Sequence, residues 1–239
     1  MTAFAFEPIA TVESPFQSKF AVPRQSGLAT EVSAFVRVDP VWRDALVGLE
    51  AVSHVWLVFV FNRVDQSRSA TRTRPPRLGG NTRLGVFATR STHRPNPIGL
   101  SLARVDAIEP DGLRVRGVDL LHGTPVLDIK PYVPWADRCD TAVNTLSPAP
   151  PPRCAVHWSA HALSRLATLG ADRQVSVRAL LEDVLQFEAR PAYHSDPNRQ
   201  YGTELAELEV RWRYPTAQSV EVLDLLPLGL NQSDRDEPN

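Results

Sequence analysis

The feature that most constrains the fold is a run of β-branched and aromatic residues, VSHVWLVFVF, at residues 52–61. A run of this length and composition is too short and too apolar for an exposed helix, so it predicts a buried strand. Further segments of strand composition cover 6–12, 85–89, 98–108, 113–119 and 126–129, with a hairpin turn at Asp111-Gly112. Many short strands separated by turns favour a closed β-barrel or a sandwich.

The character of the chain changes after Tyr132. Residues 144–153, NTLSPAPPPR, are stiffened by proline and are typical of a linker. Helices are expected at 159–169 and 176–187, and strands at 204–214 and 220–225. We therefore expect a mainly β protein, with a β-barrel domain at 1–140, a proline-rich linker at 141–158, a small α+β domain at 159–231 and a disordered tail at 232–239.

Composition and missing motifs exclude several classes of protein. The 239 residues are 43% apolar, which is ample for a buried core. The sequence has no apolar run of about 18 residues and no signal peptide, so we expect a cytoplasmic protein without a membrane partner. Neither GxGxxG nor GxxxxGK[ST] occurs, which argues against a Rossmann fold.

The two cysteines, Cys139 and Cys154, are expected to be reduced thiols without a catalytic part. Together with His157 and His161 they resemble a zinc pattern only superficially, since the paired Cys-x-x-Cys knuckle is missing. We therefore predict no metal site.

Charge is distributed unevenly along the chain. Residues 63–94 contain eight arginines and one acid, whereas residues 182–239 contain twelve acids and five arginines. The basic segment includes a long loop at 66–81 and resembles the surface of a protein that binds a polyanion. A simpler explanation is a general preference for arginine, since the only lysines are Lys19 and Lys130. That preference explains the choice of cation but not its clustering.

Two loops that follow strands carry polar groups on a stiffened backbone. In FAVPRQSG, residues 20–27, Pro23 fixes the chain beside Arg24 and Gln25, whose side chains could hold a carboxylate or the edge of a base. In TRSTHRPNPIG, residues 89–99, two prolines hold Arg94 and Asn96 in an extended conformation. Such a loop loses little entropy when it binds a ligand.

A third segment, VDLLHGTPVLDIKPY at 118–132, places carboxylates among apolar residues. Asp119 ends a strand, and Gly123 allows a tight turn after it. Asp128 lies within an apolar strand, so it either faces solvent or pairs with a cation such as Lys130. An ion pair that pins the barrel and a role in a functional site both remain open for Asp128.

Four motifs, FAVPRQSG, RPPRLGGN, GVFATRSTHRPNPIGLSL and DLLHGTPVLDIKPY, together and in this order closely resemble the TrmO family (YaeB-like or TsaA-like) of tRNA N6-adenosine methyltransferases. The likeness extends to Tyr132 and, more loosely, to RPAY and VRW near Arg190 and Val210. It implies a homodimeric β-barrel enzyme that uses S-adenosylmethionine without a Rossmann fold. The implied substrate is N6-threonylcarbamoyladenosine, on the 3′ side of the anticodon in a threonine tRNA.

The resemblance also implies a set of cofactor-binding residues. Carried over position by position, they are Pro23, Arg24, Gln25, Asn62, Arg63, Arg90, Leu100, Asp119, Leu120, Leu121 and His122. The sequence departs from the family at Asn62-Arg63, where relatives often have His-Gln.

The remaining residues of the motifs are expected to serve the RNA. Arg94 and Asn96 would face the substrate nucleotide, while Arg72, Arg74 and Arg77 of the long loop would follow the RNA backbone. Asp128 is the candidate for accepting the N6 proton.

Tyr132 is an alternative hydrogen-bonding partner for the N6 group, and the sequence does not identify an aromatic residue that stacks on a base. Two other functions stay open, a non-catalytic RNA-binding barrel and a methyltransferase that acts on a small molecule.

Overall fold

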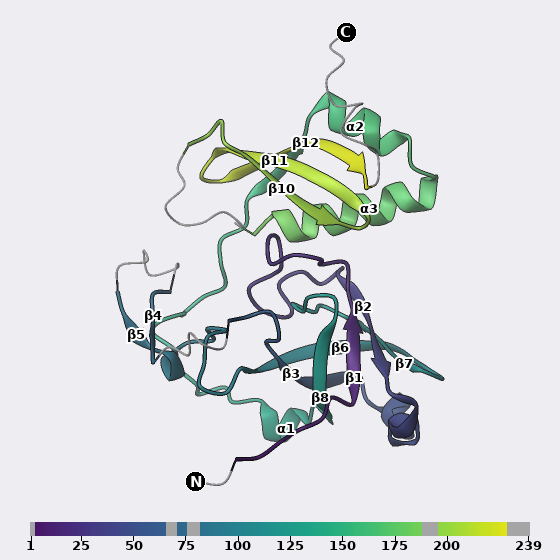
Figure 1. Cartoon of the computed structure of the whole chain (residues 1–239). Coiled ribbons are helices and arrows are strands. Elements are labelled where there is room, and N and C mark those ends of the chain that lie inside the picture. The colour runs from purple at the N-terminus through teal and green to yellow at the C-terminus, as the bar shows by residue number, and fades with distance from the viewer. Residues whose placement is uncertain (1–2, 66–70, 76–81, 188–195, 229–239) are drawn as a thin grey trace.

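The computed structural model of the chain describes residues 3–65, 71–75, 82–187 and 196–228. In Figure 1 a β-barrel forms the lower half of the molecule, and a smaller sheet with two helices forms the upper half. The expectation of a mainly β protein that is not a Rossmann fold is confirmed.

Six antiparallel strands form the barrel and close it. Their order is β1-β2-β7-β6-β3-β8, and β1 pairs with β8 to complete the ring. The strands are β1 (Ala10–Glu13), β2 (Ser33–Val38), β3 (His54–Val60), β6 (Ile98–Glu109), β7 (Gly112–Arg116) and β8 (Thr124–Pro131). Closure pairs every barrel strand on both sides, so ligands have access mainly at the two ends.

The predicted strand at 52–61 is confirmed as β3. Its side chains alternate between the barrel interior and the outside, as the two-residue period of a strand requires. Val55 and Leu57 are fully buried, and Phe59 is 5% exposed. The strand β2 was not expected from the sequence, although it supplies the buried Val36 and Val38 to the same core.

A small ribbon and several short helices surround the barrel. The ribbon pairs β4 (Arg72–Thr73) with β5 (Leu84–Gly85) and lies beside the barrel in Figure 1. The short helices are η1 (Pro40–Leu46), η2 (Leu49–Ala51), η5 (Val86–Ala88) and α1 (Pro134–Asp137).

The prediction of a strand at 85–89 is wrong. β5 ends at Gly85, and Val86–Ala88 forms the 3₁₀ turn η5. The guanidinium of Arg94 donates hydrogen bonds to the carbonyls of Val86 and Thr89, at 3.1 and 2.8 Å. These contacts satisfy backbone acceptors that a strand would have offered to a neighbouring strand.

The C-terminal part is a four-stranded sheet with two helices. The sheet order is β10-β11-β12-β9, and β9 runs parallel to β12. The elements are β9 (Ala155–Trp158), α2 (Ala160–Ala167), α3 (Ala171–Leu185), β10 (Gln200–Leu205), β11 (Leu208–Thr216) and β12 (Ser219–Pro227). β9 lies inside the range expected to be a linker, and the proposed domain boundaries stay a prediction.

The expected strand at 204–214 is instead the end of β10, a tight turn and most of β11. Ala206 and Glu207 form the turn with φ angles of 54° and 62°. Tight hairpin turns usually use glycine, asparagine or aspartate for such angles, so the sequence carried no turn signal here. The helix α3 begins at Ala171, five residues before the expected start at Ser176.

The two parts of the molecule share an apolar contact. Phe16, which follows β1 and is 1% exposed, forms a β-bridge with Leu205 of β10. The hydroxyls of Ser18 and Thr203 lie 3.0 Å apart beside it. The connection between β1 and β2 therefore contacts the C-terminal sheet directly.

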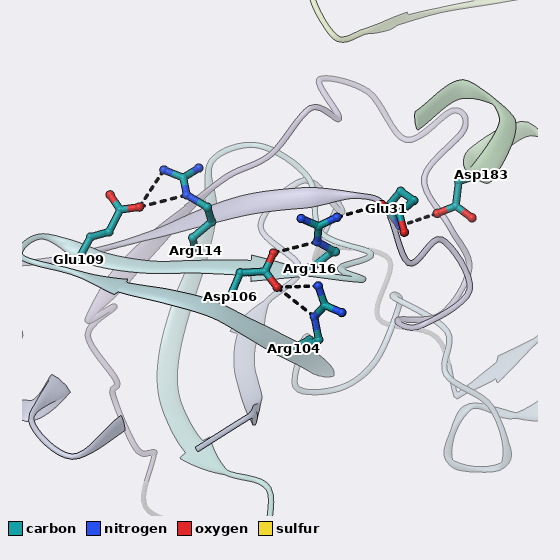
Figure 2. A network of polar contacts seen from close by, with 7 residues as sticks. All are labelled: Glu31, Arg104, Asp106, Glu109, Arg114, Arg116 and Asp183. Atoms are coloured by element: carbon teal, nitrogen blue, oxygen red, sulfur yellow. Dashed lines mark hydrogen bonds and ion pairs between the residues drawn. The ribbon is translucent and has the colours of Figure 1, made fainter. Parts of the chain in front are cut away.

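A polar network ties the outer face of the barrel to α3 (Figure 2). At a β-bulge in β6, Asp106 accepts hydrogen bonds from Arg104 and Arg116, at 2.9 and 2.8 Å. Arg116 also contacts the Glu31 carboxylate at 2.9 Å, and the Glu31 backbone N–H donates to Asp183 of α3 at 2.7 Å. Partial burial acts to raise the pKa of Asp106, but the two arginines outweigh it and hold that pKa below its ordinary value.

We expect Asp106→Asn to lower the free energy of unfolding by about 1–2 kcal/mol at pH 7, because it removes charge-assisted hydrogen bonds to two arginines. A lowered carboxylate pKa stabilises the fold above the unfolded-state pKa of about 3.9, and this contribution disappears as the pH falls through the native pKa. Urea unfolding at several pH values should therefore show the difference from wild type shrinking below about pH 4.

The matched control is Asp140→Asn, because Asp140 pairs with Arg138 while both side chains are at least 70% exposed. Its effect should stay below about 0.5 kcal/mol. If the difference in free energy of unfolding between Asp106→Asn and the wild type does not change with pH, the role given to Asp106 at the bulge is contradicted.

Candidate active site

A cavity of about 950 Å³ opens at one end of the barrel. Because β3 is antiparallel to both β6 and β8, its final residues lie beside the first residues of those two strands. Val60 pairs with Ile98 at this end. The lining comes from five segments, namely 19–25, 59–65, 89–94, 98–100 and 119–124. Four residues within these ranges, Phe20, Ala21, His122 and Gly123, are not part of the wall.

The apolar floor of the cavity depends on a glycine. Phe59 of β3 is paired with Gly99 of β6, and a Cβ atom at position 99 would lie 2.2 Å from Cζ of the Phe59 ring. The ring therefore occupies the space that any other side chain at this position would need. Phe61 packs edge-on against Phe59, with ring centroids 5.0 Å apart.

One polar wall comes from the loop that follows β5 and from the β1/β2 connection. Arg90 donates a hydrogen bond to Oε1 of Gln25 at 2.5 Å, which joins the two loops across the cavity wall. Within the described residues, the Arg24 guanidinium has no hydrogen-bond partner and is exposed at the same wall. Arg24 can therefore form a bidentate pair with an incoming carboxylate.

A second wall is held by contacts to the loop between β7 and β8. Arg63 donates to the carbonyls of Gln17 and His122, at 2.6 and 2.8 Å. Asn62 donates to the carbonyl of Gly123 at 3.2 Å. Asn62 and Arg63 thus connect the end of β3 to the β1/β2 connection and to the loop between β7 and β8.

The cavity also contains a partly buried carboxylate. Asp119 accepts a hydrogen bond from the Ser101 hydroxyl at 2.5 Å and one from the backbone N–H of Ser26. Burial raises the pKa of Asp119, while these hydrogen bonds and the charge of Arg90 oppose that shift. Asp119 is partly buried on the cavity wall, so it can accept hydrogen bonds from a polar ligand that enters the cavity.

Cations outnumber acids on the cavity wall. Its charged residues are Lys19, Arg24, Arg63, Arg90, Arg94, Asp65 and Asp119. With this excess of positive charge over an apolar floor, the cavity suits a ligand that combines a flat or apolar part with an anionic group.

The structure brings together ten of the eleven residues predicted to bind the cofactor. His122 is the exception, because its side chain lines a separate hollow beside Glu13 and Glu204, between the barrel and the C-terminal sheet. Its backbone carbonyl nevertheless receives the hydrogen bond from Arg63.

Sequence reasoning missed several residues of the site. Lys19, Phe59 and Gly99 line the cavity, and Ser101 holds Asp119. The one available signal was Lys19, which is one of two lysines in an arginine-rich chain.

The predicted RNA-binding residues lie at different places. Arg94 lines the cavity, but its guanidinium is engaged by backbone carbonyls of its own loop. Arg72 and Arg74 are exposed on or next to β4, and Asn96 is exposed outside the cavity wall. Arg77 lies outside the described residues.

The two predicted catalytic residues do not line the cavity. Asp128 forms an ion pair with Lys130 at 2.6 Å, with both side chains partly exposed. Tyr132 packs against Trp56, with ring centroids 6.0 Å apart. The part of both residues in catalysis stays a prediction.

No set of three or more His, Cys, Asp or Glu side chains suited to a metal ion occurs within the described residues. Cys139 and Cys154 are free thiols, the first exposed and the second buried. None of the described helices is long and apolar enough to cross a membrane.

Two family models match this chain. The tRNA-methyltransferase O N-terminal domain matches residues 11–138, and the TrmO C-terminal domain matches residues 151–228. The chain belongs to the TrmO family.

Relatives match it over nearly the whole length. RcsF of Pseudomonas aeruginosa, whose name places it among S-adenosylmethionine-dependent methyltransferases, is 47% identical over 91% of this chain and 96% of its own. An Escherichia coli protein named tRNA (adenine(37)-N6)-methyltransferase is 40% identical over 95% of this chain and all of its own. The crystal structure of TrmO from Pseudomonas aeruginosa superposes with a TM-score of 0.78 at 40% identity, covering 94% of this chain and 98% of that one.

We expect Gly99→Ala to weaken S-adenosylmethionine binding, because the new methyl group would push the Phe59 ring out of its place in the cavity floor. Overpacking of this kind should also lower the free energy of unfolding by roughly 1–3 kcal/mol. Calorimetry of cofactor binding and urea unfolding measure the two effects.

Gly85→Ala is the matched control. Nothing lies within 4 Å of a Cβ atom at position 85, and its φ of −60° suits alanine. Cofactor affinity in Gly99→Ala equal to that of Gly85→Ala would contradict the role given to this glycine.

Proposed function

We propose that this protein methylates N6 of N6-threonylcarbamoyladenosine, on the 3′ side of the anticodon in a threonine tRNA, and that it does so as a cytoplasmic homodimer. At the coarser level, the TrmO family makes it an S-adenosylmethionine-dependent tRNA (adenine-N6)-methyltransferase. One observation supports the threonylcarbamoyl group as part of the substrate. Cations outnumber acids on the wall of a cavity that is large enough to hold the cofactor together with part of a nucleotide.

The substrate and the cofactor both present carboxylates. S-adenosylmethionine has one on its amino-acid portion, and the threonylcarbamoyl group brings another to the modified base. Lys19, Arg24 and Arg90 come from two loops that face the cavity, so they can pair with anionic groups in different positions. An unmodified adenosine would leave part of this positive charge without a partner.

The residues of the cavity fit the cofactor. Arg24, Gln25 and Arg90 would hold its carboxylate, and the partly buried Asp119 would accept hydrogen bonds from its amino or hydroxyl groups. The apolar wall at Leu100, Leu120 and Leu121 would receive its adenine ring. When bound, S-adenosylmethionine supplies the methyl group.

The protein contributes mainly by positioning the reactants. Phe59 and Gly99 shape a floor that excludes water, and the hydrogen bond between Arg90 and Gln25 fixes one wall before any ligand arrives. The N6 atom bears a proton that must leave during methylation. Asp128 is our proposed acceptor and Tyr132 an alternative hydrogen-bonding partner, although neither lines the cavity of its own chain.

The deciding experiment is mass spectrometry of nucleosides from a threonine tRNA that carries the threonylcarbamoyl group, incubated with the protein with and without S-adenosylmethionine. We expect a gain of one methyl group on the modified adenosine only when the cofactor is present. Methylation of unmodified adenosine at equal rate would reject the proposed nucleoside. No methylation, with cofactor binding retained in calorimetry, would point to a small-molecule substrate.

The same assay tests Asp128. Because its side chain lies outside the cavity, Asp128→Asn should bind S-adenosylmethionine as the wild type does. An inactive variant would support the role of proton acceptor, and unchanged turnover would remove Asp128 from the mechanism.

The exposed arginines on and next to β4, Arg72 and Arg74, are the proposed contacts to the RNA backbone. Replacing Arg72 and Arg74 together by alanine should raise the dissociation constant for tRNA between about 2- and 30-fold, since an exposed ion pair contributes roughly 0.2–1 kcal/mol. The slope of log affinity against log salt should also become shallower by about 0.7 for each phosphate of single-stranded RNA that no longer pairs with an arginine. Filter binding at several salt concentrations measures both.

Cofactor affinity should be unchanged in this variant, because neither residue lines the cavity. The control Arg104→Ala/Arg114→Ala removes two arginines of similar exposure, on β6 and β7. An equal decrease of tRNA affinity in the two double variants would contradict a localised RNA-binding face.

A further inference from the structure

Phe87 is an exposed aromatic residue on a turn that is held in place. Its side chain is 82% exposed at the middle of η5, whereas the neighbouring Val86 is 2% exposed. Solvent exposure of a large aromatic ring is unfavourable. Exposure alone does not indicate a function, however, because single exposed apolar residues are common on protein surfaces. What distinguishes Phe87 is the set of hydrogen bonds that fix the backbone beneath it.

Side chains and backbone groups on both sides brace the turn. Arg94 donates to the carbonyls of Val86, Thr89 and Ser91, and the Thr89 hydroxyl donates to Val86 O at 3.0 Å. The Val86 N–H donates to Thr71 O at 3.1 Å, which joins the turn to the β4/β5 ribbon. The ring of Phe87 is thus presented by a fixed backbone, so it would lose little conformational entropy on binding a partner.

One arginine lies close to this ring, and two others are near it along the chain or in the β4/β5 ribbon. The guanidinium of Arg94 lies 6.0 Å from its centroid. Arg90 follows three residues later on the cavity wall, and Arg72 is paired in register with Gly85, at the end of the strand that leads into the turn. An exposed aromatic face among arginines is the combination that binds unpaired nucleotides, because the arginines contact phosphates while bases stack on the ring.

We infer that Phe87 is the platform on which an unpaired base of the tRNA anticodon loop stacks, next to the nucleotide that enters the cavity. This inference rests on the proposed function for its ligand and adds the contact that orients the loop. A second protein subunit is the competing occupant, since an exposed apolar residue can also mark an interface between chains. The arginines of this segment favour the RNA, because a second copy would bring its own arginines against these.

The test uses an anticodon stem-loop RNA that carries unmodified adenosine on the 3′ side of the anticodon. Phe87→Ala should weaken binding of this RNA roughly 5- to 150-fold, the range found when an aromatic stacking partner of a base is removed. Phe87→Trp should retain wild-type affinity, and its indole fluorescence should change when the RNA is added. S-adenosylmethionine affinity should be the same in all these proteins.

Phe4→Ala is the matched control, because Phe4 is also a phenylalanine, is 83% exposed and lies outside the segments that match the TrmO family. Its RNA affinity should equal that of the wild type. Unchanged RNA affinity in Phe87→Ala would overturn the inference. A shift of the sedimentation coefficient toward a smaller species in Phe87→Ala, with RNA affinity unchanged, would assign Phe87 to a subunit interface instead.

The outcome is independent of the identity of the methylated nucleoside. Binding of the unmodified stem-loop is measured without turnover, so a failure of the threonylcarbamoyl assay would leave the result for Phe87 standing. Conversely, methylation of the modified tRNA by Phe87→Ala with an unchanged Michaelis constant would contradict the stacking contact while supporting the proposed reaction.

Discussion

The pairing of β1 with β8 is the constraint on which the rest of the structure depends. It closes the sheet, so each barrel strand is hydrogen-bonded on both sides and the interior is filled by side chains such as Val55 and Leu57. A ligand site can then form only where strands end and their connections meet. The cavity lies at such an end, beside a bulge where Val58 and Phe59 of β3 change register against β8.

The arginines of the site divide into two groups by what their guanidinium groups contact. Arg63 and Arg94 bind backbone carbonyls and hold the loops of the site in place. All four line the cavity, but Arg90 contacts only the Gln25 side chain and Arg24 has no hydrogen-bond partner within the described residues, so these two can reach a ligand. The cationic segment 89–97 therefore both holds its own loop in place and forms part of the binding surface. Its prolines limit the backbone conformations open to Arg94 before it binds the carbonyls.

The C-terminal sheet contacts the same connection that carries Pro23, Arg24 and Gln25. Phe16 pairs with Leu205, and Thr203 donates to the carbonyl of Phe20 at 3.4 Å. Directly after Phe20, Ala21 is buried with a φ of 65°, a conformation uncommon for alanine. Packing of the C-terminal sheet thus helps to place one wall of the cavity, which gives this part of the chain a role in the site that does not require contact with RNA.

The sequence by itself determined the local character of the chain. The strands β3, β6 and β8, the helix that starts after Ser159 and the motif loops could be predicted, because strand period, capping residues and proline act on near neighbours. Family motifs indicated ten residues that do line one cavity. Only the tertiary structure decided which loops converge, since that depends on pairings between residues far apart in the chain. It replaced the expected strand at 85–89 by a turn, because Arg94 takes the carbonyls of Val86 and Thr89. It also left Asp128 paired with Lys130 outside the cavity, because a carboxylate on a strand faces whichever side the barrel register assigns to it.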